Sequence, residues 1–212
     1  MQEKILNEEE VENTSALSRM EIWRDGDSEN PREWSNTFTL WTGNSRYLSN
    51  DKDAEDPRTV EGTKVEEAKY KKGLFAIPLY AYIHSGMALS LHPFSCKWDS
   101  GVIGFLYCDK EKFKKDFGLK RFNAKRALEI AEGEISTLQD FIDGNVFGYT
   151  IERRDSPDGE WEFEDSCGGW YGFEVMLREN GAFEKGMVLW TKSPNEFPKK
   201  VDCSKQTEKE RS

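Results

Sequence analysis

The stretch GLFAIPLYAYIHSGMALSLHPFSCKWDSGVIGFLYC, residues 73–108, decides the fold of this chain. It contains three apolar runs separated by HSG and by KWDSG, and such runs between turn residues are typical of consecutive β-strands. Pro78 lies inside the first run, where a proline is compatible with a sheet edge or a bulge. Asp99, Ser100 and Gly101 predict a tight turn, because Asp and Ser side chains bond to nearby backbone and Gly allows a positive φ.

Further strands are predicted on both sides of this stretch. Four segments have the β-branched and aromatic composition of strands, namely residues 36–42, 145–154, 169–177 and 186–190. The alternation in WEFED, residues 161–165, predicts a strand with Trp161 and Phe163 turned inward and the acidic residues outward.

The clearest helix signal covers residues 124–142. Asn123 is a suitable N-cap, apolar residues follow at helical spacing, and Gly144 stands just past the end. A shorter helix is predicted over residues 109–118. Strands, then helices, then strands, without regular βαβ units, predict an α+β fold: a mainly antiparallel sheet with one long and one short helix packed on it.

The domain organisation follows from where apolar residues are scarce. Residues 1–20 are acidic and predict a flexible N-terminal segment, and residues 194–212 predict a flexible tail. A single α+β domain is expected over residues 21–193, with a charged insertion at residues 49–72.

Composition narrows the class of function. The 212 residues carry a formal net charge of -10, the sequence pI is about 4.9, and the mean hydropathy is -0.79. Direct nucleic-acid binding is disfavoured, because such binding needs Lys and Arg to replace phosphate counterions. The acidity has two explanations: general solubility, or an acidic face that meets a basic protein surface, including one built to hold nucleic acid. No run approaches the roughly 20 apolar residues that span a bilayer, and the N-terminus has no apolar signal region, so a cytoplasmic location is expected.

The four cysteines do not form a metal-binding pattern. Cys96, Cys108, Cys167 and Cys203 include no CxxC pair, and the chain has two histidines, His84 and His92. In a cytoplasmic protein these cysteines are expected to be reduced thiols. The sequence therefore predicts no metal site and no cofactor.

Three residue types within sixteen positions, Cys, His and Asp, are candidates for catalysis. Cys96 would be a nucleophile if His84 or His92 lay within hydrogen-bond reach, with Asp99 orienting the imidazole. The alternative is that His84 is a turn histidine and Cys96 a small buried thiol. No protease or transferase signature surrounds Cys96, and the sequence therefore favours a non-catalytic protein over an enzyme.

The candidates for binding fall into three groups. The predicted long helix carries acidic residues on one face, and the loop after residues 36–42 contains Arg46 as a possible anion contact. Two Ser-Cys segments, around Cys96 and Cys167, would form a pocket if they lay at the same end of the sheet. The candidate binding residues are Glu129, Glu132, Asp140, Arg46, Trp98, Cys167 and Trp170.

Six segments together resemble a family of small proteins carried by bacteriophages and by conjugative elements of bacteria. They are NPREWSN, LWTGNSRYLSND, PLYAYIHSG, PFSCKWDSGVIGFLY, EGEISTLQDFIDGNVFGYTIE and DSCGGWYG, which span residues 30–172. The Trp-Asp-Ser-Gly segment is the most specific part. Two features depart from the family: the loop GNSRYL is poorer in His and Arg, and Ile83 stands where an acidic residue usually precedes His-Ser-Gly. An Asp-His couple is therefore absent from that turn.

The resemblance implies context and no assigned activity. Carriage by mobile elements implies an accessory role in the host cytosol, such as blocking a host defence nuclease or effector complex. The expected function is therefore a non-catalytic, protein-binding inhibitor whose partner is a host protein complex. Two alternatives stay open: a small hydrolase that uses Cys96 or His84, and a small-molecule or nucleotide-binding protein that uses Arg46. The sequence carries no signal for an oligomeric state.

Overall fold

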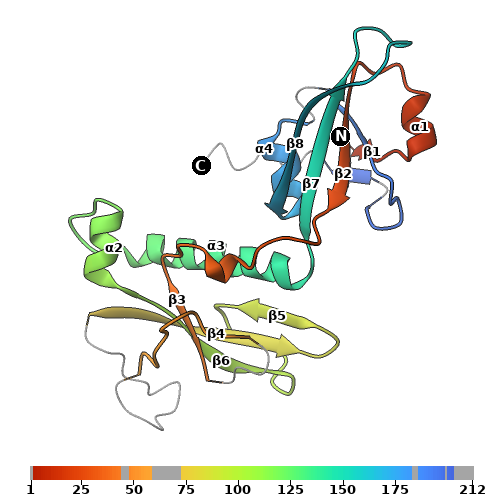
Figure 1. Ribbon diagram of the computed structural model, residues 1–212. Coiled ribbons are helices and arrows are strands. Elements are labelled where there is room, and N and C mark those ends of the chain that lie inside the picture. The colour runs from red at the N-terminus through yellow and green to blue at the C-terminus, as the bar shows by residue number, and fades with distance from the viewer. Residues whose placement is uncertain (1, 44–47, 59–72, 183–185, 199, 203–212) are drawn as a thin grey trace. The chain divides into compact units, whose positions relative to one another are not determined.

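The chain forms two compact units (Figure 1). The computed structural model describes residues 2–43, 48–58, 73–182, 186–198 and 200–202. Unit 1 comprises Met1–Glu29 and Asp143–Ser212, and unit 2 comprises Asn30–Ile142. Both unit boundaries fall inside residues 21–193, which were expected to form a single domain. The predicted α+β class is confirmed, because helices accompany two four-stranded sheets in which most neighbouring strands are antiparallel.

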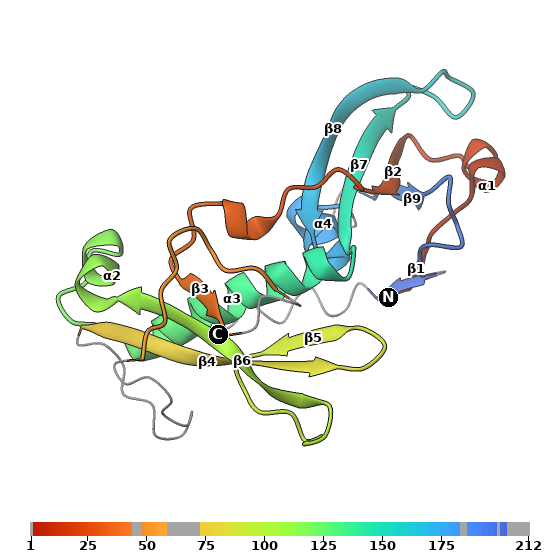
Figure 2. The same cartoon turned by 60° about the horizontal axis from the view of Figure 1, so that its bottom comes forward.

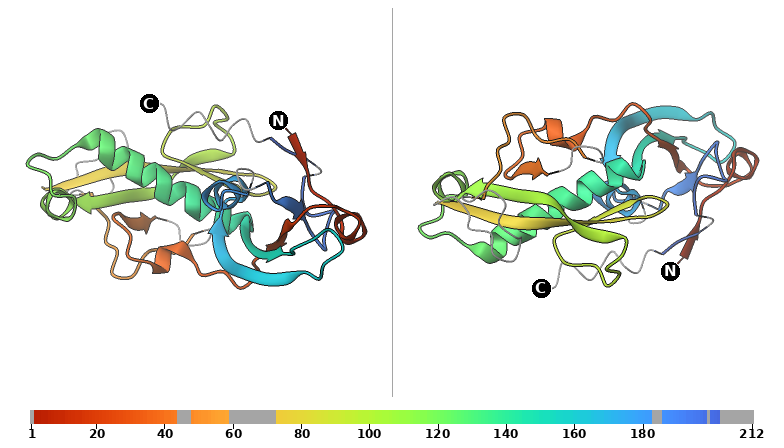
Figure 3. Two further views of the ribbon diagram at one scale, coloured as in Figure 1. Left: turned by 90° about the horizontal axis from the view of Figure 1, so that it is seen from above. Right: turned by 90° about the horizontal axis from the view of Figure 1, so that it is seen from below.

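Unit 2 is a four-stranded antiparallel sheet with helices packed on it. The strand order is β3-β6-β4-β5, where β3 is Thr39–Thr42, β4 Leu74–Ile83, β5 Met87–Ser90 and β6 Ser100–Asp109. The 3-10 helix η1 (Pro31–Glu33) precedes β3, and helices α2 (Lys110–Asp116) and α3 (Ala124–Ile142) follow β6. Helix α3 lies over one face of the sheet, as Figures 2 and 3 show. The three strands predicted in residues 73–108 are thus confirmed.

Pro78 occupies a position where β4 has one neighbour. Its Cα partner is Phe105 in β6, whereas β5 pairs only with the segment from Tyr80 to Ile83. The register between β4 and β6 also shifts between Leu79 and Tyr80. Since proline cannot donate a ladder hydrogen bond, its place beyond the end of β5 and next to an irregularity explains why the strand tolerates it.

Helix α3 follows the pattern that predicted it. The Asn123 side chain accepts a hydrogen bond from the Arg126 amide at 3.1 Å, and Gly144 adopts a φ of 66°. The residues that α3 buries in the core of unit 2 are Ala127, Ala131, Ile135 and Leu138.

Unit 1 contains a second four-stranded sheet in the order β8-β7-β2-β9. Strands β2 (Ser18–Arg24), β7 (Val146–Arg153) and β8 (Glu162–Tyr171) are antiparallel neighbours, and β9 (Val188–Trp190) runs parallel to β2. Helix α4 (Phe173–Glu179) follows β8. A separate two-stranded sheet joins β1 (Gln2–Lys4) to β10 (Lys200–Asp202).

The N-terminal segment is more ordered than the sequence predicted. Residues 1–20 were expected to be flexible, yet they include helix α1 (Glu8–Glu12) and the start of β2. Val11 and Met20 are fully buried. Few apolar residues are enough here, because the rest of the sheet in unit 1 comes from residues far along the chain.

Two strand predictions near β8 are wrong in detail. Residues 169–177 were predicted as one strand, but β8 ends at Tyr171 and α4 begins at Phe173. Gly172, at a φ of 91°, separates the two elements, and few other residues adopt that conformation. Phe163 was expected to face inward, but its exposed fraction is 68%, because it pairs with Glu152 on the face of the sheet opposite to the buried Ile151. Trp161 lies just before β8, where the guanidinium groups of Arg19 and Arg154 stack on its ring at 4.3 and 4.2 Å.

Strand β3 packs closely against β6 at Gly104, and a substitution there tests this packing. A Cβ atom on Gly104 would collide with the Trp41 carbonyl oxygen and stand 2.8 Å from the Thr42 Cα, whereas Gly101 in the same strand has open space. We expect Gly104→Ala to lower the free energy of unfolding by about 1–3 kcal/mol, because backbone must move. Gly101→Ala should change it by less than about 0.5 kcal/mol. Urea unfolding of both variants measures the difference, and equal stabilities would contradict this packing.

Candidate functional site

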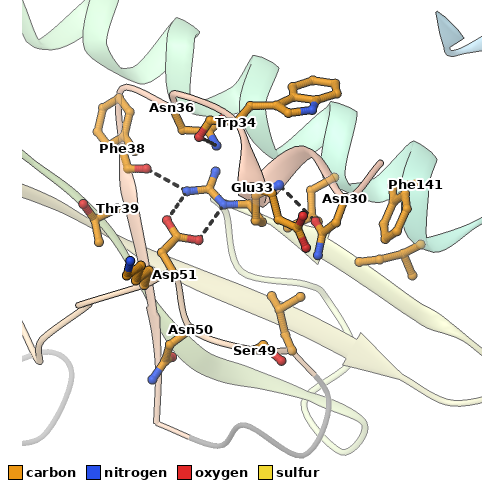
Figure 4. Close-up of a pocket in the computed structure, with 15 residues that line it drawn as sticks. Asn30, Glu33, Trp34, Asn36, Phe38, Thr39, Ser49, Asn50, Asp51 and Phe141 are labelled. Carbon is orange, nitrogen blue, oxygen red and sulfur yellow. Dashed lines mark hydrogen bonds and ion pairs between the residues drawn. The ribbon is translucent and has the colours of Figure 1, made fainter. Parts of the chain in front are cut away.

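A buried ion network organises one side of unit 2. Arg32 in η1 has a side chain that is only 6% exposed. Its Nε and Nη2 atoms bond to the two oxygens of Asp51 at 3.0 and 2.5 Å, and Nη1 bonds to Glu134 Oε2 at 3.0 Å. Nη2 also donates to the Phe38 carbonyl oxygen at 2.7 Å (Figure 4). Burial by itself would lower the pKa of Arg32, but the bonds to Asp51 and Glu134 raise it above the ordinary arginine value.

The two carboxylates of this network also hold backbone. Glu134 Oε1 accepts hydrogen bonds from the amides of Thr37 and Phe38 at 2.7 and 3.2 Å, and Asp51 Oδ2 accepts from the Leu40 amide at 2.8 Å. Burial raises the pKa of Glu134, while Arg32 and the two amides act in the opposite direction. The network therefore fixes the segment that leads into β3 against α3.

A pocket of about 780 Å³ opens beside this network. Its apolar wall includes Trp34, Leu138 and Phe141, as Figure 4 shows for Trp34 and Phe141. This volume would fit a small molecule. Several of its polar groups are used within the chain, however: Asn36 Nδ2 donates to the Pro31 and Trp34 carbonyl oxygens, and the donors of Arg32 bind Asp51, Glu134 and Phe38.

The catalytic candidates lie in two turns of unit 2. The Cys96 thiol is 3.9 Å from Asp99 Oδ2. The His84 ring packs on Tyr82 with centroids 6.4 Å apart, and His92 Nε2 is 3.4 Å from Glu132 Oε1. Among the described contacts, neither imidazole bonds to the Cys96 sulfur. The nucleophile and base are thus not brought together, and a catalytic role for them stays a prediction.

The Asp-Ser-Gly segment closes the loop between β5 and β6. The Asp99 carbonyl oxygen accepts a hydrogen bond from the Ile83 amide at 2.8 Å, and the Ser100 hydroxyl donates to the Cys96 carbonyl oxygen. Gly101 was expected to supply a positive φ, but it lies inside β6 and is not among the positive-φ glycines. Trp98 stands in this loop with 95% of its surface exposed.

The remaining binding candidates are dispersed. Cys167 is exposed in β8 of unit 1, and the Trp170 ring lies 6.3 Å from the ring of Tyr149. Cys96 belongs to unit 2 and Cys167 to unit 1, so their shared pocket stays a prediction. Arg46 lies outside the described residues.

The acidic face predicted on α3 is partly compensated. Glu129 and Glu132 are exposed and Asp140 is half-buried. Lys125 Nζ lies 3.9 Å from Glu129 Oε1, and Glu132 faces His92. One cation, Lys125, therefore lies beside this face, and a binding role for Glu129, Glu132 and Asp140 stays a prediction.

The structure shows a concentration of charge that sequence reasoning missed. Residues 30–142 contain 17 Lys and Arg against 16 Asp and Glu, whereas the rest of the chain contains 13 against 24. Unit 1 therefore carries a formal charge of -11 and unit 2 a formal charge of +1. Six of the 24 acidic residues of unit 1 are exposed carboxylates of the β7–β8 hairpin, namely Asp155, Asp158, Glu160, Glu162, Glu164 and Asp165.

The arginines of the same hairpin leave most of these carboxylates uncompensated. Arg153 pairs with Glu164. Arg154 is buried, and it donates to the carbonyl oxygens of Thr14 and Ala16 instead of to an acid. The sequence shows the acidic residues of 155–165, but only the structure shows that Arg154 is directed away from them.

The Arg32 network can be tested through stability. Arg32→Met leaves Asp51 and Glu134 buried without their cation, so we expect the free energy of unfolding to fall by about 3–5 kcal/mol. The control is Lys125→Met, because Lys125 and Glu129 form an exposed pair with side chains 88% and 59% exposed. Removing that pair should cost less than about 1 kcal/mol. Urea unfolding compares the two variants, and a similar loss for both would refute a central role of Arg32.

Thiol reactivity tests the burial of β6. Burial, with a smaller effect from the charge of Asp109, raises the pKa of Cys108 to about 12. At pH 8 roughly one Cys108 in 10⁴ would be a thiolate, the form that reacts. We expect iodoacetamide to label the exposed Cys167 well before Cys108, and Cys108 to react only after urea is added. Peptide mass spectrometry over time measures this order, and equal labelling rates in the native protein would contradict it.

Comparisons with known proteins identify no relative, so the function of this chain is inferred from its own geometry. No family model, no curated protein and no solved structure matches it. Within the described residues, no cluster of three or more His, Cys, Asp or Glu could hold a metal ion. In the same part of the chain, no helix is both long and apolar enough to cross a membrane. The resemblance to proteins of mobile elements stays a prediction based on the sequence segments that carry it.

Proposed function

We propose that this chain is a non-catalytic inhibitor that a bacteriophage or mobile element uses in the host cytosol. Its acidic unit 1 binds the basic surface of a host defence nuclease or effector complex. The observation that carries the proposal is the separation of charge, with -11 on unit 1 and +1 on unit 2. An even, solubilising distribution of acidic residues does not explain such a separation.

The chemistry of a nuclease fits this surface. A protein that holds nucleic acid places Lys and Arg where phosphates bind. An opposing row of carboxylates attracts that surface at long range and speeds association. The β7–β8 hairpin offers such a row, with Asp158, Glu160 and Glu162 exposed within five positions.

The hairpin suits this role better than α3 does. Glu129 and Glu132 were the acidic contacts expected from the sequence, but each has a cationic or titratable neighbour within 4 Å. On the hairpin, Arg154 is directed into unit 1. A partner that approaches the hairpin therefore meets carboxylates with less competition from the chain's own cations.

The two alternative functions receive less support. A hydrolase that used Cys96 would need a nearby base, and among the described contacts neither histidine bonds to that thiol. A small-molecule binder would use the pocket beside Arg32, whose guanidinium is already bonded to Asp51, Glu134 and Phe38. We therefore propose binding to a protein as the function.

Charge reversal on matched faces tests this function. The hairpin variant carries Asp158→Lys, Glu160→Lys and Glu162→Lys, and the control carries Glu111→Lys, Glu129→Lys and Glu132→Lys, so both shift the net charge equally. Each protein is expressed in bacterial strains that contain one nuclease-based defence system, and phage plating efficiency is measured. We expect the natural chain and the control to restore plating in at least one strain, and the hairpin variant to lose at least about ten-fold of that effect, because each lost charge contact weakens binding.

Two outcomes would overturn the proposal. Failure of the natural chain to restore plating against any nuclease system would remove the anti-defence role. Full activity of the hairpin variant, with loss in the control, would move the binding surface to helices α2 and α3. Circular dichroism of both purified variants verifies that they are folded.

A further inference from the structure

Strand β8 leaves one side of its backbone without a neighbour among the described strands. In the order β8-β7-β2-β9 it is an edge strand, and its described pairing is with β7 alone. Every residue from Glu162 to Gly169 is exposed. The Ser166 amide donates to its own neighbour's side chain, Asp165 Oδ1, at 2.9 Å. An exposed edge of this length is a template for another strand.

The two faces of β8 differ in chemistry. Phe163 pairs with Glu152 and Ser166 with Thr150, which places them on one face of the sheet. Glu162 pairs with Arg153 and Asp165 with Ile151, which places these two on the other face. Directly opposed residues of neighbouring strands share a face. A strand added at this edge would therefore place apolar side chains beside Phe163 and cationic ones beside Glu162 and Asp165.

The charge of unit 1 selects between possible occupants of this edge. A second copy of the chain would bring two formal charges of -11 together, and this repulsion opposes pairing between copies. The same charge attracts a basic strand. Like-charge repulsion against one partner and attraction to another is how proteins separate wrong pairings from correct ones.

We propose that the outer edge of β8 accepts a strand from the partner protein, one in which basic and apolar side chains alternate. Backbone hydrogen bonds supply affinity, and the alternating side chains supply specificity, as in other cases of strand addition. This inference rests on the proposed function, because it names how the acidic unit holds its basic partner. The exposed ring of Phe163 would then contact an apolar side chain of the added strand on the same face of the sheet.

A pair of peptides separates backbone pairing from charge attraction. One is a nine-residue peptide of alternating Lys and Val, and the other has the same sequence with every backbone amide nitrogen methylated. Both carry equal charge, but the methylated peptide has no amide that can donate a hydrogen bond from either edge. Fluorescence anisotropy at 150 mM salt measures the dissociation constant of each peptide for the full chain.

We expect the methylated peptide to bind at least about ten-fold more weakly, the equivalent of about 1.4 kcal/mol. Hydrogen exchange should show that the unmethylated peptide protects amides within residues 162–169. Glu162→Lys should weaken binding of the unmethylated peptide, whereas Glu111→Lys on α2 should leave its affinity unchanged. Equal affinity of the two peptides, or no binding at 1 mM, would overturn strand addition.

Two further results separate this inference from the proposed function. If charge reversal of the hairpin abolishes phage relief while the two peptides bind equally, the function stands and strand addition is wrong. If the peptide pairs with β8 while no nuclease system is relieved, strand addition stands and the anti-defence role is wrong. Sedimentation of the chain alone measures whether it forms a dimer. A dimer that the peptide dissociates would show that a second copy of the chain occupies the edge of β8. That result would overturn the proposal that a basic partner strand binds there.

Discussion

The ion network of Arg32 is the interaction on which unit 2 depends. One guanidinium binds Asp51 and Glu134 and also the Phe38 carbonyl oxygen, so it joins η1, the loop after β3 and helix α3. A buried arginine is tolerated because nearly all its donors find oxygen atoms, and the carboxylates in turn hold the backbone amides that lead into β3. Strand β3 can then approach β6 so closely that only glycine fits at position 104. The pocket beside the network is lined by Arg32 and Asp51, whose charged groups are already bonded to each other.

Unit 1 uses its arginines differently, and this difference produces its charged surface. Arg19 pairs with Glu12 and Glu152 and stacks on Trp161, while Arg154 bonds to backbone carbonyl oxygens. Both arginines form their described bonds within the body of unit 1. None of these bonds engages the exposed carboxylates between Asp155 and Asp165 on the hairpin that joins β7 to β8. A structural requirement of the core thus leaves an excess of negative charge at one edge. The proposed binding of a basic protein follows from that excess together with the exposed edge of β8.

The sequence predicted some sites from residue types that the structure does not assemble. Cys96, His84 and Asp99 are close in the chain, but turns direct the two histidines toward Tyr82 and Glu132 instead of toward the thiol. The Asp-Ser-Gly segment bonds to the neighbouring backbone, which is the structural role that its residue types favour. Conversely, Arg32 carried no motif, and its importance rests on contacts with Asp51 and Glu134 that lie 19 and 102 positions away.

The sequence by itself determined the three strands of residues 73–108, the helix over residues 124–142 and the α+β class. These features depend on apolar periodicity, caps and turn residues, which act over a few neighbouring positions. Only the tertiary structure decided that residues 18–24 form a strand beside β7, that β8 is an edge, and that Phe163 is exposed. Each of these depends on pairing between distant segments, as the bond between Arg19 and Glu152, 133 positions apart, illustrates. A local pattern states which face of a strand is apolar, but what covers that face is set by the rest of the chain.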